Sequence, residues 1–112
     1  MTDEELVDAL KALAHPVRLR ILRALTGTER NVGEIDDAAD IGQPTLSQQL
    51  AVLRNAGLVK TRKDAKLVYY RIDETRIAKV VDAAGALGGL SGNPVPQSRQ
   101  PAPGVANFAK LG

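Results

Sequence analysis

The sequence predicts a mainly α-helical domain with one small β-hairpin. Apolar residues recur at intervals of three and four in five separate stretches, which is the spacing that gives a helix one apolar face. Proline and glycine separate several of these stretches. Between residues 58 and 72 the pattern changes to Val, Thr, Tyr and Ile around a polar centre, as in two paired strands. The 112 residues suffice for one domain of this kind.

Two helices are expected first, at residues 3–14 and from Pro16 to Gly27. Thr2 and Glu5 have the spacing of a capping box, in which each side chain accepts a hydrogen bond from a backbone N–H. Pro16 ends the first helix and opens the second. The apolar positions are Leu6, Leu10 and Leu13 in the first helix and Val17, Ile21, Ala24 and Leu25 in the second.

Two short helices joined by a glycine-containing turn are expected next. The first runs from Val32 to Ala39, Gly42 supplies the turn, and the second extends from Pro44 to about Asn55. Proline is tolerated in a first helical turn, where its missing N–H costs no hydrogen bond. At about 100° per residue, three leucines of the second helix share one face and must point to the core. These are Leu46, Leu50 and Leu53, and the opposite face carries Thr45, Gln48, Val52 and Asn55.

A β-hairpin is expected over residues 58–72, with its polar tip at residues 63–65. Neighbouring residues of a strand face opposite sides, so at least one of Tyr69 and Tyr70 belongs to the core. A fifth helix follows Asp73, which is a favourable N-cap residue. Its apolar residues are Ile77, Val80, Val81, Ala84 and Leu87.

The chain is expected to divide near residue 90. Residues 91–112 hold four of the six prolines and a single aromatic residue, too little apolar surface to form a core. We therefore predict one domain over residues 1–90 and a flexible Pro/Gly-rich tail over residues 91–112. The sequence shows neither a secretory signal pattern nor 18 consecutive apolar residues, so we expect a cytoplasmic protein without a membrane span.

Charge is segregated along the chain, although the net charge is only +2. Residues 58–72 carry five basic side chains and one acidic one, whereas residues 31–40 carry four acidic side chains and no basic one. A basic segment of this kind favours contact with a polyanion. The absence of cysteine excludes disulfides, thiolate metal ligands and thiol redox chemistry.

Two short helices joined by a turn, the second polar on its outer face, are typical of the helix-turn-helix that enters the DNA major groove. A polar helix face alone is equally compatible with a solvated surface. The basic hairpin favours DNA binding, because its tip would lie beside a phosphate backbone as the wing of a winged helix-turn-helix. The residues predicted to contact double-stranded DNA are Gln43, Thr45, Ser47, Gln48 and Gln49 in the helix at 43–55, and Arg62, Lys63 and Lys66 in the wing at 58–72.

Three segments carry a resemblance to a known family. HPVRLRILRAL, QPTLSQQLAVLRNAGLV and TRKDAKLVYYRI together resemble the ArsR/SmtB family of bacterial repressors, in particular the branch that responds to sulfide and persulfide. The resemblance implies a homodimeric repressor that binds a palindromic operator, with the first and fifth helices forming the dimer. The residues expected at that interface are Leu6, Leu10, Ile77, Val80, Val81, Ala84 and Leu87.

The sequence departs from the family at every sensor site that the resemblance implies. Positions matching the metal-binding Cys-x-Cys pair hold Asn31, Val32 and Gly33, and those matching the persulfide-forming cysteines hold Arg23 and Gly89. Metal positions of the fifth helix hold Glu74, Arg76, Leu87 and Leu90. We therefore expect no metal and no cofactor. Regulation is left to a small organic effector at the dimer seam, a protein partner or expression level alone.

Other hypotheses compete with this interpretation. Asp36, Asp37 and Asp40 offer a carboxylate-only metal site, although acidic residues on a short exposed helix are usually solvated. His15, beside Pro16, fits a capping or surface role better than metal ligation. A helix-turn-helix retained for protein interaction would be expected to lose its Gln and Ser face. An enzyme is disfavoured, since no nucleophile, base and pocket are assembled.

Overall fold

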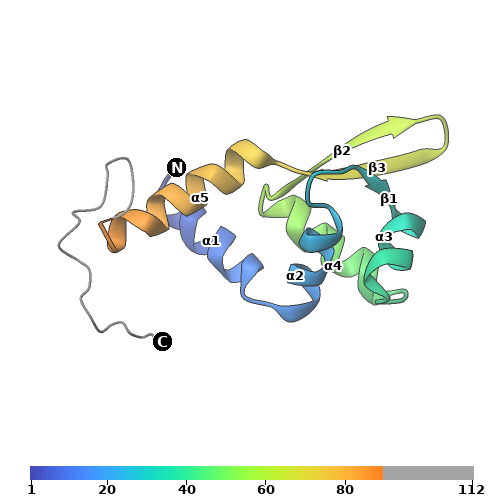
Figure 1. Ribbon diagram of the computed structural model, residues 1–112, viewed down its shortest axis with the longest axis horizontal. Coiled ribbons are helices and arrows are strands. Elements are labelled where there is room, and N and C mark those ends of the chain that lie inside the picture. The colour runs from blue at the N-terminus through green and yellow to red at the C-terminus, as the bar shows by residue number, and fades with distance from the viewer. Residues whose placement is uncertain (90–112) are drawn as a thin grey trace, which may run out of the picture. The chain divides into compact units, whose positions relative to one another are not determined.

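The structure, a computed structural model, describes residues 1–89, and the predicted tail lies outside the described residues. The described chain forms five helices and three strands (Figure 1). None of these helices is long and apolar enough to cross a membrane. The helices are α1 (Asp3–Leu13), α2 (Pro16–Ala24), α3 (Val32–Ala39), α4 (Thr45–Asn55) and α5 (Glu74–Leu87), and the strands are β1 (Arg30–Asn31), β2 (Val59–Asp64) and β3 (Leu67–Ile72).

The starts of the first two helices are set by side chains that accept hydrogen bonds from backbone N–H groups. The N–H of Glu5 donates to the Thr2 hydroxyl at 3.1 Å, and the N–H of Thr2 donates to the Glu5 carboxylate at 2.8 Å. The predicted capping box is therefore confirmed. The Nδ1 atom of His15 accepts from the N–H of Val17 at 3.2 Å, so the only histidine of the chain caps α2.

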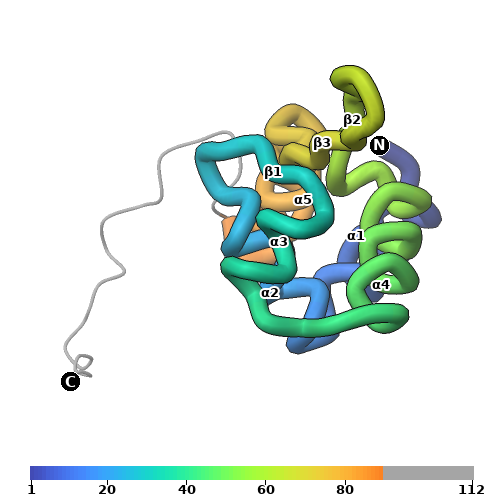
Figure 2. Tube along the Cα trace, turned by 90° about the vertical axis from the view of Figure 1, so that its right-hand side faces the viewer, coloured from blue at the N-terminus to red at the C-terminus, as the bar shows by residue number. Residues whose placement is uncertain are grey.

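The core of the compact unit Met1–Val80 is built from one face of each helix. The three leucines predicted to face inward on α4, Leu46, Leu50 and Leu53, are at most 1% exposed. They pack with Ile21 of α2 and with Leu25, which directly follows α2, and α2 and α4 lie against each other (Figure 2). The predicted rotation of α4 about its axis is confirmed, which fixes the residues on its outward face.

Helix α1 faces the core with two alanines rather than with its leucines. Its fully buried residues are Ala9 and Ala12, while Leu6 and Leu13 pack against the core only partly. Leu10 is 39% exposed. Small residues at the centre of the inward face let a helix approach its neighbours closely, and this displaces the larger leucines to the flanks.

The predicted hairpin is confirmed, and a third strand joins it. The sheet is antiparallel with the order β1-β3-β2, so β3 lies in the middle (Figure 2). Arg30 pairs with Tyr70, and Asn31 pairs with Tyr69. The sequence did not predict β1, because two residues are too few to show an alternating pattern. Asn31 also forms a capping box with Glu34 at the start of α3.

Helix α5 begins in the unit Met1–Val80 and ends in a second unit that starts at Val81. Val80 is only 3% exposed and belongs to the core, and Ile77 packs against that core. Val81 and Leu87 are 64% and 88% exposed. The single apolar stripe predicted for this helix is therefore divided. Burial of Val80 within its own chain corrects its assignment to a dimer interface.

Arg76 connects the start of α5 to α1 and to the turn that follows α4. Its backbone N–H donates to the Asp73 carboxylate at 3.0 Å, which confirms the predicted N-cap. Its Nη2 atom lies 3.7 Å from a carboxylate oxygen of Glu5. Gly57 adopts a φ of +77°, and a Cβ atom there would lie 3.1 Å from the Nε atom of Arg76. The left-handed backbone at this position therefore favours glycine, and any larger residue would also have to displace the Arg76 side chain.

Candidate nucleic-acid interface

The turn between α3 and α4 is held by two side chains. One carboxylate oxygen of Asp36 accepts from the backbone N–H groups of Ile41 and Gly42, at 3.0 and 2.8 Å. Both bonds lower the pKa of Asp36, and the bond from Gly42 has the larger effect. Arg20 of α2 donates to two backbone carbonyl oxygens at the end of α3. The orientation of α4 relative to α3 is therefore fixed by direct hydrogen bonds.

These bonds bear on the carboxylate-only metal site. Asp36 already accepts two hydrogen bonds from the turn, so its carboxylate is part of the fold of this segment. Within residues 1–89, no group of three or more His, Cys, Asp or Glu side chains could hold a metal ion. The structure thus assigns Asp36 to the turn and does not bring Asp36, Asp37 and Asp40 together as a group of metal ligands.

The outward face of α4 is polar. Thr45, Ser47 and Gln48 are exposed, and within residues 1–89 none of their side chains has a hydrogen-bond partner. Gln43 is also exposed, but its side-chain oxygen accepts from the N–H of Ser47 at 3.1 Å and so supports the start of α4. Gln49 is half-buried, and its Oε1 atom is buried without a partner. Of the five residues predicted to contact DNA in the segment 43–55, three present free polar groups to a ligand.

The basic residues of the wing fall into two groups. Lys63 and Lys66 are exposed at the tip of the hairpin, and neither forms an ion pair within the described chain. Arg62 is held instead by Glu29, which precedes β1. The Nε atom of Arg62 donates to both carboxylate oxygens of Glu29 at 2.8 and 2.9 Å, and Nη2 lies 2.7 Å from one of them.

Two further groups surround the Arg62 guanidinium. Its Nη1 atom lies 3.7 Å from Asp64, and its central carbon lies 4.8 Å from the ring centre of Tyr69, the residue opposite it in the hairpin. The hydrogen bond from Arg62 is the largest cause that lowers the pKa of Glu29, and the same bond raises the pKa of Arg62. The sequence predicts that Arg62 is an unpaired side chain available to bind a DNA phosphate. In the structure, its charge is instead compensated by Glu29.

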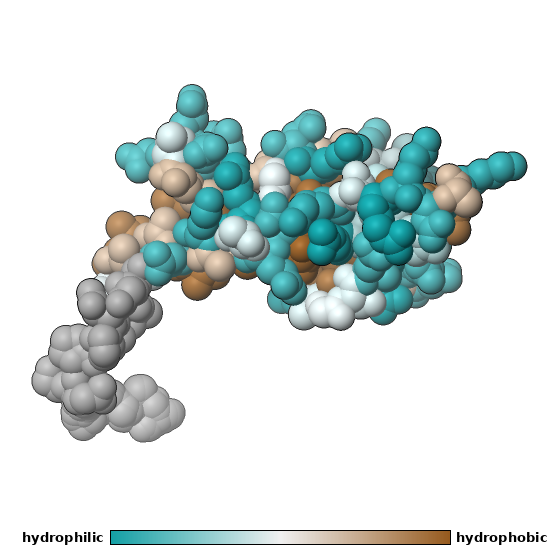
Figure 3. Space-filling model, turned by 90° about the horizontal axis from the view of Figure 1, so that it is seen from above, coloured by the Kyte–Doolittle hydropathy of each residue, from teal (hydrophilic) through white to brown (hydrophobic). Residues whose placement is uncertain are grey.

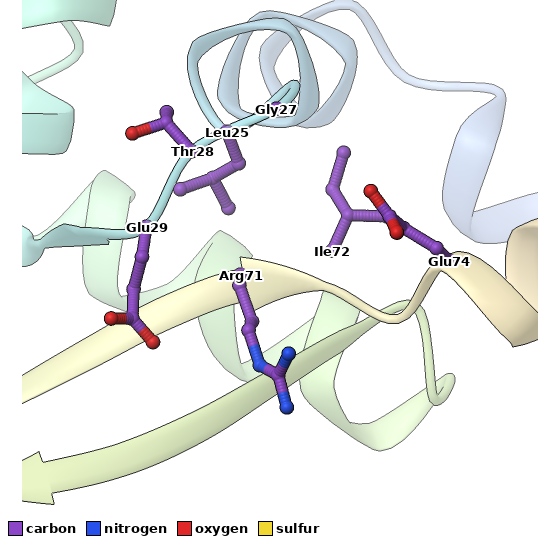
Figure 4. Close-up of a pocket in the computed structure, with 7 residues that line it drawn as sticks. All are labelled: Leu25, Gly27, Thr28, Glu29, Arg71, Ile72 and Glu74. Atoms are coloured by element: carbon purple, nitrogen blue, oxygen red, sulfur yellow. The ribbon is translucent and has the colours of Figure 1, made fainter.

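A hollow of about 340 Å³ lies between the loop after α2 and the end of β3 (Figure 4). The side chains of Leu25 and Ile72 lie between the loop and the strand, while those of Arg71 and Glu74 point to different sides. Glu29 also lines the hollow, and its carboxylate is bound by Arg62. Since its charges do not converge on one point, the hollow favours no class of ligand.

A winged helix-turn-helix with an open polar recognition helix and a lysine-tipped wing defines a class, the DNA-binding regulators of transcription. A family model described as a helix-turn-helix domain matches residues 13–62. The biofilm growth-associated repressor of Xylella fastidiosa is 48% identical over 79 residues, which cover 70% of this chain and 69% of that protein. The transcriptional activator HlyU of Vibrio cholerae is 42% identical over 73 residues, which cover 65% and 68%.

Solved structures agree with these relatives. The transcriptional repressor BigR from Xylella fastidiosa superposes with a TM-score of 0.61 at 44% identity, over 78% of this chain and 96% of that chain. An ArsR-like transcriptional regulator from Rhodococcus sp. RHA1 has a TM-score of 0.70 at 21% identity, over 76% and 80%, which shows a shared fold. The HTH-type transcriptional repressor SmtB of Mycobacterium tuberculosis is 38% identical over 89 residues, which cover 76% of this chain and 66% of that protein. The chain belongs to the ArsR/SmtB family of winged helix-turn-helix, DNA-binding transcriptional regulators. The fold class and family predicted from the sequence are confirmed.

Proposed function

We propose that this regulator is a homodimeric repressor that binds a palindromic operator in double-stranded DNA. One observation carries the proposal: α4 turns its three leucines into the core and leaves Thr45, Ser47 and Gln48 free on the opposite face. The relative that is 48% identical is named a repressor, whereas the one that is 42% identical is named an activator, so the more similar of the two supports repression. The same family membership supports a cytoplasmic protein that is not an enzyme.

The free side chains of α4 suit reading of base edges. Gln48 lies centrally on the outward face, and its amide can form two hydrogen bonds with the major-groove edge of adenine. Thr45, about one turn nearer the start of the helix, and Ser47, the residue before Gln48, are suited to a thymine methyl group or a phosphate. Lys63 and Lys66 of the wing would neutralise phosphates and contribute affinity for any sequence.

Exposed apolar side chains support the proposed homodimer. On α1, Val7 and Leu10 are 46% and 39% exposed. On the second half of α5, Val81 and Leu87 are more exposed still, and brown and tan side chains gather along this helix (Figure 3). Apolar groups of this size on a small domain are stabilised when a second copy covers them. Leu6, Ile77 and Ala84, which are half-buried, would contribute less area.

The proposal can be tested by selecting binding sites from random double-stranded DNA with the purified full chain. We expect enrichment of an inverted repeat, as a dimer with two recognition helices requires. Gln48→Ala should weaken the enrichment, whereas the control Lys79→Ala, an exposed lysine on α5, should not. Enrichment of no sequence, or of a single unrepeated half-site, would contradict the proposal.

A further inference from the structure

A second hollow of about 340 Å³ lies in the unit Met1–Val80, where α1, α2 and α4 meet. It contains none of the residues to which the proposed function assigns DNA contacts. Its volume is at the lower end of the range found for small-molecule sites. Its wall includes Asp8, Lys11, Ala12, Arg18, Val52 and Asn55.

The basic groups of this hollow have no partner in the part of the chain that the structure describes. Arg18 makes no hydrogen bond or ion pair within residues 1–89, and its Nε atom is buried. Lys11 is likewise unpaired, and the side-chain amide of Asn55 has no partner among the described residues. A guanidinium group with a buried, unsatisfied N–H is stabilised by an acceptor oxygen. With two cations against the single carboxylate of Asp8, the hollow favours an anionic ligand.

The remaining wall is apolar. Ala12 is 3% exposed and belongs to the core, and Ala56 is half-buried. Val52 is 38% exposed and is the only large apolar side chain on the outward half of α4. An inorganic anion would leave this apolar surface uncovered, whereas an organic acid would cover it. Charge and apolar area together point to a ligand with one carboxylate and a small hydrocarbon body.

The position of the hollow allows it to act on DNA binding. At about 100° per residue, Asp8 and Ala12 lie on the flank of α1 opposite to Leu10, so a dimer that covers Leu10 leaves the hollow open. On α4, Val52 follows Gln48 by four residues and lies one turn further on nearly the same face. A bound carboxylate would offset the net positive charge that Lys11 and Arg18, opposed by Asp8, give this hollow. It would thereby remove positive charge beside the recognition helix, where a phosphate backbone would approach.

We propose that this hollow binds a small organic carboxylate, with Arg18 and Lys11 holding the carboxylate and Val52 and Ala12 contacting its hydrocarbon part, and that occupancy weakens binding to DNA. The second half of this inference rests on the proposed role of α4. The coupling is reciprocal, so DNA should weaken binding of the acid by the same factor.

The first measurement uses the DNA-free full chain and a panel of straight-chain and phenyl-substituted alkanoic acids, each paired with the corresponding alcohol. Calorimetry and thermal unfolding should show that at least one acid binds and raises Tm while its alcohol does not. Lys11→Gln and Arg18→Gln should each weaken binding at least tenfold, with Lys79→Gln as the matched control. Circular dichroism checks that each variant folds. If Arg18→Gln does not fold, Lys11→Gln still provides the test, because Lys11 is exposed.

Three outcomes would overturn the site itself. These are absence of acid binding at millimolar concentration, equal binding of acids and alcohols, and binding that Lys11→Gln leaves unchanged. A lower salt dependence of DNA binding in Lys11→Gln, without acid binding by the native chain, would instead assign these cations to DNA phosphates. These results need no operator, so failure of the site is distinguishable from failure of the proposed function.

The second measurement tests the coupling. The acid that binds most tightly should raise the Kd for the selected operator several-fold in the native chain and leave it unchanged in Lys11→Gln. An unchanged Kd in the native chain, with the acid bound, would show that the hollow is a binding site without regulatory effect and would overturn that half of the proposal.

Discussion

Helices α4 and α5 differ in what they leave uncovered. Helix α4 buries all three of its leucines, and its outward face is polar apart from Val52. Helix α5 buries Val80 but leaves Val81 and Leu87 largely exposed. A helix whose apolar residues are satisfied by its own chain can present polar groups to a polar ligand. A helix with surplus apolar area is stabilised by another protein surface, so the two helices point to two different partners.

The strongest test of this contrast is Val81→Asp on α5. A charge at this exposed position should prevent a second copy from covering it, leaving a monomer. Loss of the paired recognition helices should then weaken operator binding by about 10² or more. Sedimentation and operator titration check both effects, with Thr75→Asp, another exposed site on α5, as the control. A dimer that survives Val81→Asp would show that the exposed apolar residues of α5 have another role.

The inward face of α4 is tested by Leu50→Ala. Because Leu50 is only 1% exposed, its truncation should leave a cavity and lower the free energy of unfolding by about 2–5 kcal/mol. Val52→Ala, on the exposed side of the same helix, should change it by about 0.5 kcal/mol or less. Urea denaturation distinguishes the two. Similar losses for both variants would mean that α4 is rotated from the orientation described.

The outward face of α4 is tested by Gln48→Ala. Loss of its amide should cost about 1–3 kcal/mol per half-site on the preferred operator and little on random DNA. Gln49→Ala is the matched control, because the Oε1 atom of Gln49 is buried and cannot accept a hydrogen bond from the edge of a base. Competition binding with both DNAs measures the difference. Equal losses on operator and random DNA would make Gln48 a backbone contact.

The wing offers a smaller and more specific test. Lys63→Ala should reduce the slope of log affinity against log salt concentration by about one for each contacting site. Arg62→Ala should leave that slope nearly unchanged, because Glu29 already compensates the charge of Arg62. Salt titrations of DNA binding compare the two. Equal reductions would indicate that Arg62 leaves Glu29 and binds phosphate when DNA is present.

No effect is expected from the effectors of relatives with intact sensor sites. The chain has no cysteine, so thiolate ligation and persulfide formation are chemically excluded. Zinc, nickel, arsenite and polysulfide should therefore leave operator binding by the metal-free protein unchanged. Fluorescence anisotropy with each compound is sufficient to check this. Release of DNA that is abolished by Asp36→Asn or by His15→Ala would refute it.

Local patterns predicted much of this molecule. The capping box at Thr2, the inward leucines of α4, the hairpin and the N-cap Asp73 each depend on residues within a few positions of one another. The same reasoning identified Gln48 and the two wing lysines, which stay predictions until DNA binding is measured. The features that escaped prediction involve residues distant in sequence.

Three examples show why distance matters. The ion pair between Arg62 and Glu29 joins residues 33 positions apart, and no periodic pattern in the sequence predicts such a contact. Strand β1 exists because β3 pairs with it. The burial of Val80, rather than of a continuous stripe on α5, depends on where the core of the unit Met1–Val80 ends. In each case, the outcome was decided by tertiary packing that a single sequence does not display.

Asn31 belongs to two structures at once. Its backbone pairs with Tyr69 in the sheet, and its side chain accepts the N–H of Glu34 at 2.9 Å in the first turn of α3. Asn31 therefore connects the wing strand β3 directly to the first helix of the helix-turn-helix. A displacement of β3 on DNA would pull on the first turn of α3, and fraying of that turn would loosen the edge of the sheet. The wing and the helix-turn-helix should therefore open and close together as one cooperative element.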